Sequence, residues 1–174
     1  MRIIENAISD ELIDSCIEEI QGKKKQDVWG ISKWKWGVPL QQAYRLTACL
    51  SNKPDVHNYN QIRNETTRHF ETPASNINYH VWLPGSGIGW HDDDNYSYGA
   101  TLYLNDWPPE KGAIFMWKEK YTGELNCINP KRNLLVINDC GEDHAVSPVL
   151  AGEDMGLRMS IQIFSVKINP DYHE

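Results

Sequence analysis

Near its middle the chain reads Ile77-Asn78-Tyr79-His80-Val81-Trp82-Leu83-Pro84-Gly85-Ser86-Gly87, a short apolar segment that runs into a turn. Segments of the same kind follow at Tyr98–Leu104, Ala113–Trp117, Leu125–Ile128, Leu134–Ile137, Ala145–Leu150 and Leu157–Ile168. Turn residues such as Asn105-Asp106 and Asn129-Pro130 separate them. Short strands at this spacing predict a mainly β fold, either a β-sandwich or a jelly roll (double-stranded β-helix).

The N-terminal part has a different texture. Ser9 is a candidate N-cap, and apolar residues at helical spacing follow it until Gly22, so we expect a helix there. A second helix is expected from about Pro54 to Phe70, with short strands or a hairpin over residues 28–50. We therefore predict one domain over residues 1–174. Residues 1–75 would form a helical, Trp-rich support packed against one sheet, and residues 76–168 the jelly-roll core.

Composition and charge disfavour nucleic-acid-binding, membrane-spanning and secreted proteins. A chain of 174 residues with a formal charge of −7 is poorly suited to binding nucleic-acid phosphates, so we expect no nucleic-acid partner. It has no apolar stretch long enough to span a bilayer and no secretory h-region after Met1. Its four cysteines are dispersed, which favours reduced thiols. We expect a cytoplasmic protein without membrane contact, as a monomer or homodimer.

The segment His91-Asp92-Asp93-Asp94 carries the first chemical signal. If this segment is a strand, His91 and Asp93 point to the same face, while Asp92 and Asp94 point to the other. A distant histidine, His144, would complete a set of two imidazoles and one carboxylate. Such a set on one side of a metal, with open positions opposite, is typical of non-haem Fe(II) oxygenases.

The order of the motifs is more specific than any one of them. After H-x-D come Thr101-Leu102-Tyr103-Leu104-Asn105, then Gly112-Ala113-Ile114, then His144-Ala145-Val146-Ser147-Pro148-Val149, then Arg158-Met159-Ser160. In this order the chain resembles the 2-oxoglutarate/Fe(II)-dependent dioxygenases, in particular their prolyl 4-hydroxylase-like branch. The resemblance covers residues 82–165, about half of the chain.

The resemblance implies Fe(II), 2-oxoglutarate and O₂, with ascorbate as a candidate reductant. His91, Asp93 and His144 would bind the metal and be catalytic. Arg158 offers a permanently charged fork for the distal carboxylate of 2-oxoglutarate. Ser160 lies on the same strand face as Arg158, and the resemblance places Tyr103 in the same pocket.

Further residues are implicated less directly. Phe164 matches an aromatic position that lines the site in this branch, and core filling is an equal alternative. Relatives carry a cosubstrate-binding tyrosine where this chain has Trp82 or Leu83, so that hydrogen bond is either missing here or supplied by Tyr79 or Tyr103. The Trp29–Trp36 segment is a candidate lid, or a cover for the helical layer.

The leading functional hypothesis is a dioxygenase that hydroxylates an unactivated C–H bond, most readily in a prolyl or other residue of a protein or peptide, and releases succinate and CO₂. Two alternatives stay open. One is the same chemistry on a free amino acid or small metabolite. The other is a non-catalytic jelly-roll module that binds a metal or ligand.

Overall fold

The computed structural model describes residues 1–24, 30–31, 49–94, 96–139, 141–150 and 156–166. Trp29, Trp34 and Trp36 lie outside these residues, so the lid hypothesis stays a prediction.

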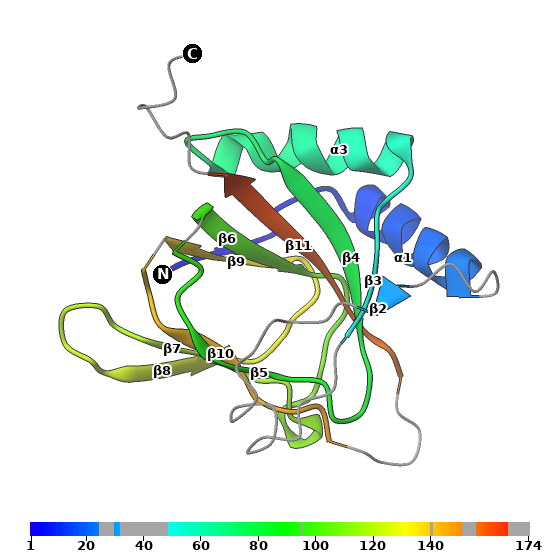
Figure 1. Ribbon diagram of the computed structural model, residues 1–174. Helices are drawn as coiled ribbons and strands as arrows, with labels where there is room; N and C mark the ends of the chain where they lie inside the picture. Colours follow the sequence, from blue (N-terminus) through cyan, green and yellow to red (C-terminus); the bar gives the residue numbers. More distant parts are fainter. Residues whose placement is uncertain (25–29, 32–48, 95, 140, 151–155, 167–174) are drawn as a thin grey trace.

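Two antiparallel sheets face each other in the described part of the chain (Figure 1). The larger one has seven strands in the order β1 (Arg2–Glu5), β9 (Leu134–Asp139), β6 (Tyr96–Tyr103), β11 (Arg158–Val166), β4 (Asn76–Trp82), β3 (Leu50–Asn52) and β2 (Gly30–Ile31). The smaller one has four, in the order β5 (Ile88–His91), β10 (His144–Val146), β7 (Phe115–Lys118) and β8 (Leu125–Ile128). The predicted jelly-roll class is confirmed.

Two helices cover the outer face of the larger sheet, α1 (Asp10–Lys24) and α3 (Val56–Thr66), and the turn η1 (Thr67–His69) follows α3. A second such turn, η2 (Pro109–Lys111), precedes β7. The prediction that Gly22 ends the first helix is wrong: the helix continues, and Lys23 pairs with Glu19 one turn earlier. The second helix begins later than Pro54 because Asp55 is its N-cap and accepts from the Asn58 backbone N–H.

Strand alternation divides the larger sheet into two chemically different faces. On β11, Met159, Ile161 and Ile163 point outward and pack with the helices, together with Ile13 of α1 and Ile62 of α3. Burial of this apolar layer fixes the register of β11, because a shift by one residue would bring the opposite set of side chains against the helices.

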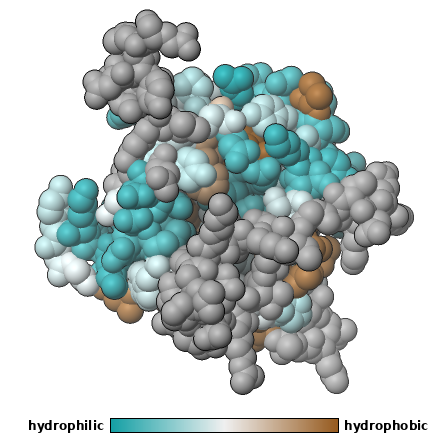
Figure 2. Space-filling view, viewed as in Figure 1, coloured by the Kyte–Doolittle hydropathy of each residue, from teal (hydrophilic) through white to brown (hydrophobic). Residues whose placement is uncertain are grey.

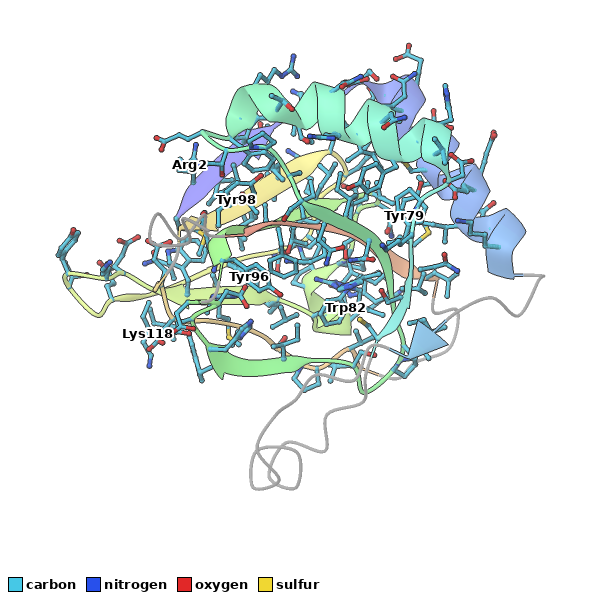
Figure 3. The ribbon with its side chains drawn as sticks, turned by 45° about the horizontal axis from the view of Figure 1, so that its top comes forward. Arg2, Tyr79, Trp82, Tyr96, Tyr98 and Lys118 are labelled. Atoms are coloured by element: carbon cyan, nitrogen blue, oxygen red, sulfur yellow. The ribbon has the colours of Figure 1, made fainter. Side chains whose placement is uncertain are left out.

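The inner face of the larger sheet meets the smaller sheet and is more polar. β4 shows the division within one strand: Tyr79 lies on the helix side and Trp82 on the side of the second sheet (Figure 3). His80 and Arg158 also belong to the inner face, and each is almost fully buried, at 3% and 1% exposed.

The outer surface is mostly polar. Hydrophilic residues cover most of the described surface in the view of Figure 2, and hydrophobic ones form small, separate patches. Among the described residues there is no helix with the length and apolar character that a membrane span requires.

Burial of His80 makes the stability of the fold depend on pH. Burial, with the neighbouring charge of Arg158, lowers the pKa of His80 from 6.5 to about 4. The unfolded chain therefore binds this proton at a higher pH than the native protein, and stability falls as pH drops from 6.5 towards 4.

We expect the free energy of unfolding to fall by about 2–3 kcal/mol between pH 7 and pH 4.5 on account of His80 alone. Urea unfolding of the metal-free protein at both pH values measures this. The variant His80→Gln should lose less stability than the wild type by about that amount. An equal loss in the two proteins would show that His80 titrates normally.

Candidate active site

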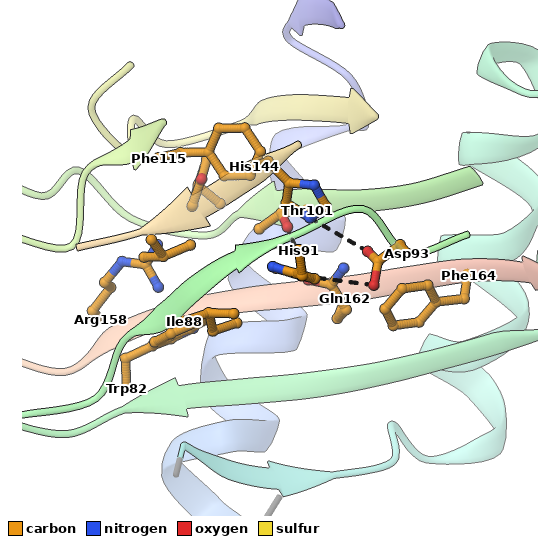
Figure 4. A pocket seen from close by; sticks show the side chains of 12 residues that line it. Trp82, Ile88, His91, Asp93, Thr101, Phe115, His144, Arg158, Gln162 and Phe164 are labelled. Atoms are coloured by element: carbon orange, nitrogen blue, oxygen red, sulfur yellow. Dashed lines mark hydrogen bonds and ion pairs between the residues drawn. The ribbon is translucent and has the colours of Figure 1, made fainter. Parts of the chain in front are cut away.

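Three side chains of the metal-binding type meet at one end of a pocket between the two sheets. His91 ends β5, His144 begins β10, and Asp93 follows β5 by two residues. One ligand atom from each lies within 4.8 Å of the other two. The Nε2 atoms of His91 and His144 lie 3.7 and 3.4 Å from the carboxylate oxygens of Asp93 (Figure 4). The residues expected to bind a metal are therefore brought together.

Asp93 reaches this cluster in a different way from the one predicted. The strand ends at His91, so alternation along a strand does not select Asp93, and that part of the reasoning was wrong. Asp93 has a left-handed backbone conformation, with φ of 52°, in a turn closed by a hydrogen bond from the Tyr96 N–H to its carbonyl. Aspartate tolerates this conformation better than most residues. Asp92 and Asp94 are exposed.

Both histidines are arranged to present Nε2 to a metal. His91 Nδ1 lies 2.9 Å from the Gly89 carbonyl and His144 Nδ1 lies 2.9 Å from the Glu142 carbonyl. A carbonyl only accepts, so the proton lies on Nδ1 in both rings, and Nε2 is the nitrogen that can bind a metal. Burial and the nearby His144 lower the pKa of His91, which favours the neutral form that binds metals.

A cation without a counter-ion lies at the other end of the pocket. Arg158 forms no ion pair with any described residue, and its Nε and Nη1 atoms have no hydrogen-bond partner there. Its guanidinium carbon lies 4.4 Å from the centre of the Trp82 ring and 5.3 Å from that of Tyr103. An unpaired buried charge is costly, so this end of the pocket is suited to an anionic ligand.

The Tyr103 hydroxyl belongs to a ring that lies against this cation, whereas Ser160 contacts the pocket-lining Trp82 and is not itself among the described residues that line the pocket. Ser160 accepts a hydrogen bond of 3.0 Å from the Trp82 indole N–H, which leaves its own proton for a ligand. The Tyr103 hydroxyl has no hydrogen-bond partner among the described residues, and burial, against the opposing effect of Arg158, raises its pKa to about 12. Tyr103 is therefore a neutral donor. Tyr79 is excluded from this role, because it lies on the helix side and donates to Glu19.

The pocket extends from Arg158 to the Asp93 cluster. Phe164 lines it as expected, stacked on Tyr96 at 4.4 Å between ring centres. Sequence reasoning missed Thr101 and Gln162, which also line it and are joined by a hydrogen bond of 2.8 Å. Alternation gave a usable signal for both, since Gln162 is four residues from Arg158 and Thr101 two from Tyr103.

This arrangement fits a small dianion that chelates a metal. One end would bind a metal held by three protein ligands, and the other would neutralise a carboxylate. The apolar side chains of Ile88, Phe115 and Val146 line the space between them.

Comparisons with known proteins agree with this reading of the pocket. A family model described as the 2OG-Fe(II) oxygenase superfamily matches residues 54–165. A search of curated proteins found no match.

Solved structures share the fold at low sequence identity. A prolyl-4-hydroxylase from Pseudomonas putida is 16% identical, with a TM-score of 0.69 over 95% of this chain and 92% of that one. A prolyl hydroxylase from Trichoplax adhaerens, in complex with a peptide fragment of the hypoxia inducible factor oxygen degradation domain, is 14% identical, with a TM-score of 0.73 over 95% and 82%. The carbocyclase SnoK from nogalamycin biosynthesis, described as non-heme and alpha ketoglutarate dependent, is 13% identical, with a TM-score of 0.65 over 93% and 77%.

The family model covers more than half of the chain, and the pocket contains a cluster of two histidines and one aspartate that could hold a metal ion. The chain therefore belongs to the 2OG-Fe(II) oxygenase superfamily, and it uses Fe(II), 2-oxoglutarate and O₂.

Proposed function

We propose that this protein is a hydroxylase that acts on a prolyl or other residue of a protein or peptide, with 2-oxoglutarate as cosubstrate. The observation that carries the cosubstrate assignment is the buried Arg158, which forms no ion pair with any described residue and lies in the same pocket as His91, Asp93 and His144. No carboxylate other than Asp93 is among the described residues that line this pocket, so a ligand must supply the missing negative charge.

In this proposal Nε2 of His91, Nε2 of His144 and the carboxylate of Asp93 hold Fe(II). Two neutral imidazoles and one carboxylate suit this metal and leave positions free for exogenous ligands. The hydrogen bonds from the two Nδ1 atoms to the carbonyls of Gly89 and Glu142 fix the orientation of the rings.

Arg158, Tyr103 and Ser160 bind the distal carboxylate of 2-oxoglutarate. Arg158 is a planar, permanently charged donor group, and its Nε and Nη1 atoms have no hydrogen-bond partner among the described residues. Tyr103 and Ser160 each add one hydroxyl donor, and the bond from Trp82 fixes the position of the Ser160 oxygen.

When bound, Fe(II) would allow O₂ to act as the oxidant, with one oxygen atom going to the substrate C–H bond and the other to 2-oxoglutarate, which is oxidised to succinate and CO₂. The protein binds and orients the reactants and keeps water away from them. Ile88, Phe115 and Val146 provide the dry walls.

The assignment of a peptide substrate rests on the aromatic surface beside Asp93 and on the fold of a peptide-binding structural neighbour. The stacked Tyr96 and Phe164 rings lie beside Asp93 and offer a flat apolar surface to an incoming side chain. The structural neighbour from Trichoplax adhaerens binds a peptide with the same fold. The net charge of −7 disfavours nucleic acid as a substrate.

The proposal is tested by following succinate. Purified protein with Fe(II), ascorbate and 2-oxoglutarate is incubated with a library of proline-containing peptides and with the same peptides carrying alanine for proline. We expect succinate in step with a mass gain of one oxygen on particular peptides. Catalytic activity on free amino acids or small metabolites alone would replace the peptide assignment. Absence of succinate with every substrate would contradict the enzyme assignment.

The choice of Asp93 among three consecutive aspartates gives a matched comparison. Asp93→Ala should raise the Kd for Co(II), used as an oxygen-stable substitute for Fe(II), by at least about 100-fold, which exceeds the loss typical of residues that only support a ligand. Asp92→Ala and Asp94→Ala, at exposed positions of the same turn, should bind Co(II) like the wild type in calorimetry. The reverse pattern would mean that another aspartate is the ligand.

Removal of the Arg158 cation should weaken 2-oxoglutarate binding without affecting the metal. For Arg158→Leu we expect the Kd for 2-oxoglutarate to rise by about 100-fold or more, since loss of one partner of a buried ion pair costs about 3–5 kcal/mol. Arg158→Lys keeps the charge but not the planar fork, so its Kd for 2-oxoglutarate should lie between that of the wild type and that of Arg158→Leu. Calorimetry on the Co(II)-loaded protein measures this. Unchanged affinity in Arg158→Leu would remove Arg158 from the cosubstrate site.

A further inference from the structure

Gly99 lies beside the metal-binding cluster, and its lack of a side chain leaves space there that other groups occupy. It lies on β6 between β9 and β11, in register with Asn138 on one side and Phe164 on the other. A methyl group at this position would lie only 2.8 Å from Asp93 Oδ2 and 2.8 Å from Asn138 Oδ1. Real side chains essentially never make contacts this short, so both groups occupy space that only a glycine leaves free.

This space matters because of how Asp93 reaches the cluster. Asp93 belongs to a turn beyond the end of β5, and its carboxylate extends over β6 to face the two imidazoles. A side chain on residue 99 would push the carboxylate away from the position in which its two oxygens lie 3.7 and 3.4 Å from the histidine Nε2 atoms. Gly99 therefore sets the position of Asp93.

Asn138 connects the same space to His144. Its amide nitrogen lies 3.0 Å from Nδ1 and 3.5 Å from Nε2 of His144, so the amide rests against the imidazole ring. Its oxygen shares the space over Gly99 with the Asp93 carboxylate. Asn138 is 4% exposed, whereas the other inward residues of β9, Leu134 and Val136, are apolar. Because the Nδ1 proton of His144 is donated to the Glu142 carbonyl, the Asn138 amide contacts the ring by packing and does not donate a hydrogen bond to Nδ1.

We propose that Gly99 and Asn138 are positioning residues of the metal centre. Gly99 admits the Asp93 carboxylate, and the Asn138 amide fills the remaining space while it holds the His144 ring in place. Neither residue contacts the metal. This inference rests on the metal centre proposed above, and it assigns two residues that the sequence motifs do not include.

The test compares Gly99→Ala and Asn138→Ala with controls of the same chemistry. Gly22→Ala is the glycine control, because a methyl group on Gly22 would meet nothing within 4 Å. Asn126→Ala on β8 is the asparagine control, at the far edge of the smaller sheet. Co(II) affinity, the visible absorption spectrum of bound Co(II), and the Tm of the metal-free protein are measured for each.

We expect Gly99→Ala and Asn138→Ala to raise the Kd for Co(II) by about 10- to 100-fold, as is typical of residues that orient a metal ligand. The spectrum of the saturated protein should also change, because the ligand geometry changes. The two controls should match the wild type in both respects. A purely structural role would lower the Tm of the metal-free protein and leave the spectrum unchanged.

Wild-type Co(II) affinity and spectrum in a folded Asn138→Ala or Gly99→Ala protein would overturn the role of that residue. If Gly99→Ala does not fold, Asn138→Ala decides the inference. If the wild type itself binds no Co(II), the metal centre is wrong, and the inference is overturned with it. A bound metal that is lost in Asp93→Ala but kept in both new variants would overturn only the inference.

Discussion

The alternation of side chains along β11 is the constraint on which the rest of this structure depends. Met159, Ile161 and Ile163 face the helices, so Arg158, Ser160, Gln162 and Phe164 must face the second sheet. The apolar contacts of the outer face lock the register, and the register then positions the polar groups of the inner face. Stability and function are therefore built on opposite sides of one strand.

Burial of the Arg158 cation on the inner face carries a desolvation cost, and no described residue forms an ion pair with it to offset that cost. Arg158 is buried against the rings of Trp82 and Tyr103, and the neighbouring His80 stays neutral. The aromatic faces offset part of the desolvation of the cation. A bound dianion would offset the rest of the desolvation free energy of Arg158. Burial of this cation therefore favours binding of an anionic cosubstrate over a neutral molecule.

The sequence was sufficient for those parts of the site that follow from local periodicity. The jelly-roll class, most strands of the core and the inward set of β11 could be predicted because each depends on alternation within one segment. Asp93 was selected by an argument that the structure does not support, since a left-handed turn and the absence of a side chain at Gly99 bring it into place.

Those two features, like the contact between Asn138 and His144, arise from segments distant in sequence, and no local pattern reveals them. In the helical layer, Gly22 and Ser9 also show that a local sequence pattern does not determine where a helix ends or which distant residue a side chain contacts. The helix passes through Gly22, and the Ser9 hydroxyl bonds to Glu65 of α3.

The central claim is that one pocket holds Fe(II) and 2-oxoglutarate together, with the metal at the His91, Asp93 and His144 end. The most direct measurement is the visible absorption spectrum of the protein under anaerobic conditions, titrated with Fe(II) and 2-oxoglutarate separately and together. The account predicts a charge-transfer band that requires both additions and is lost in His91→Ala. A wild-type protein that binds Fe(II) but gives no such band with 2-oxoglutarate would contradict it.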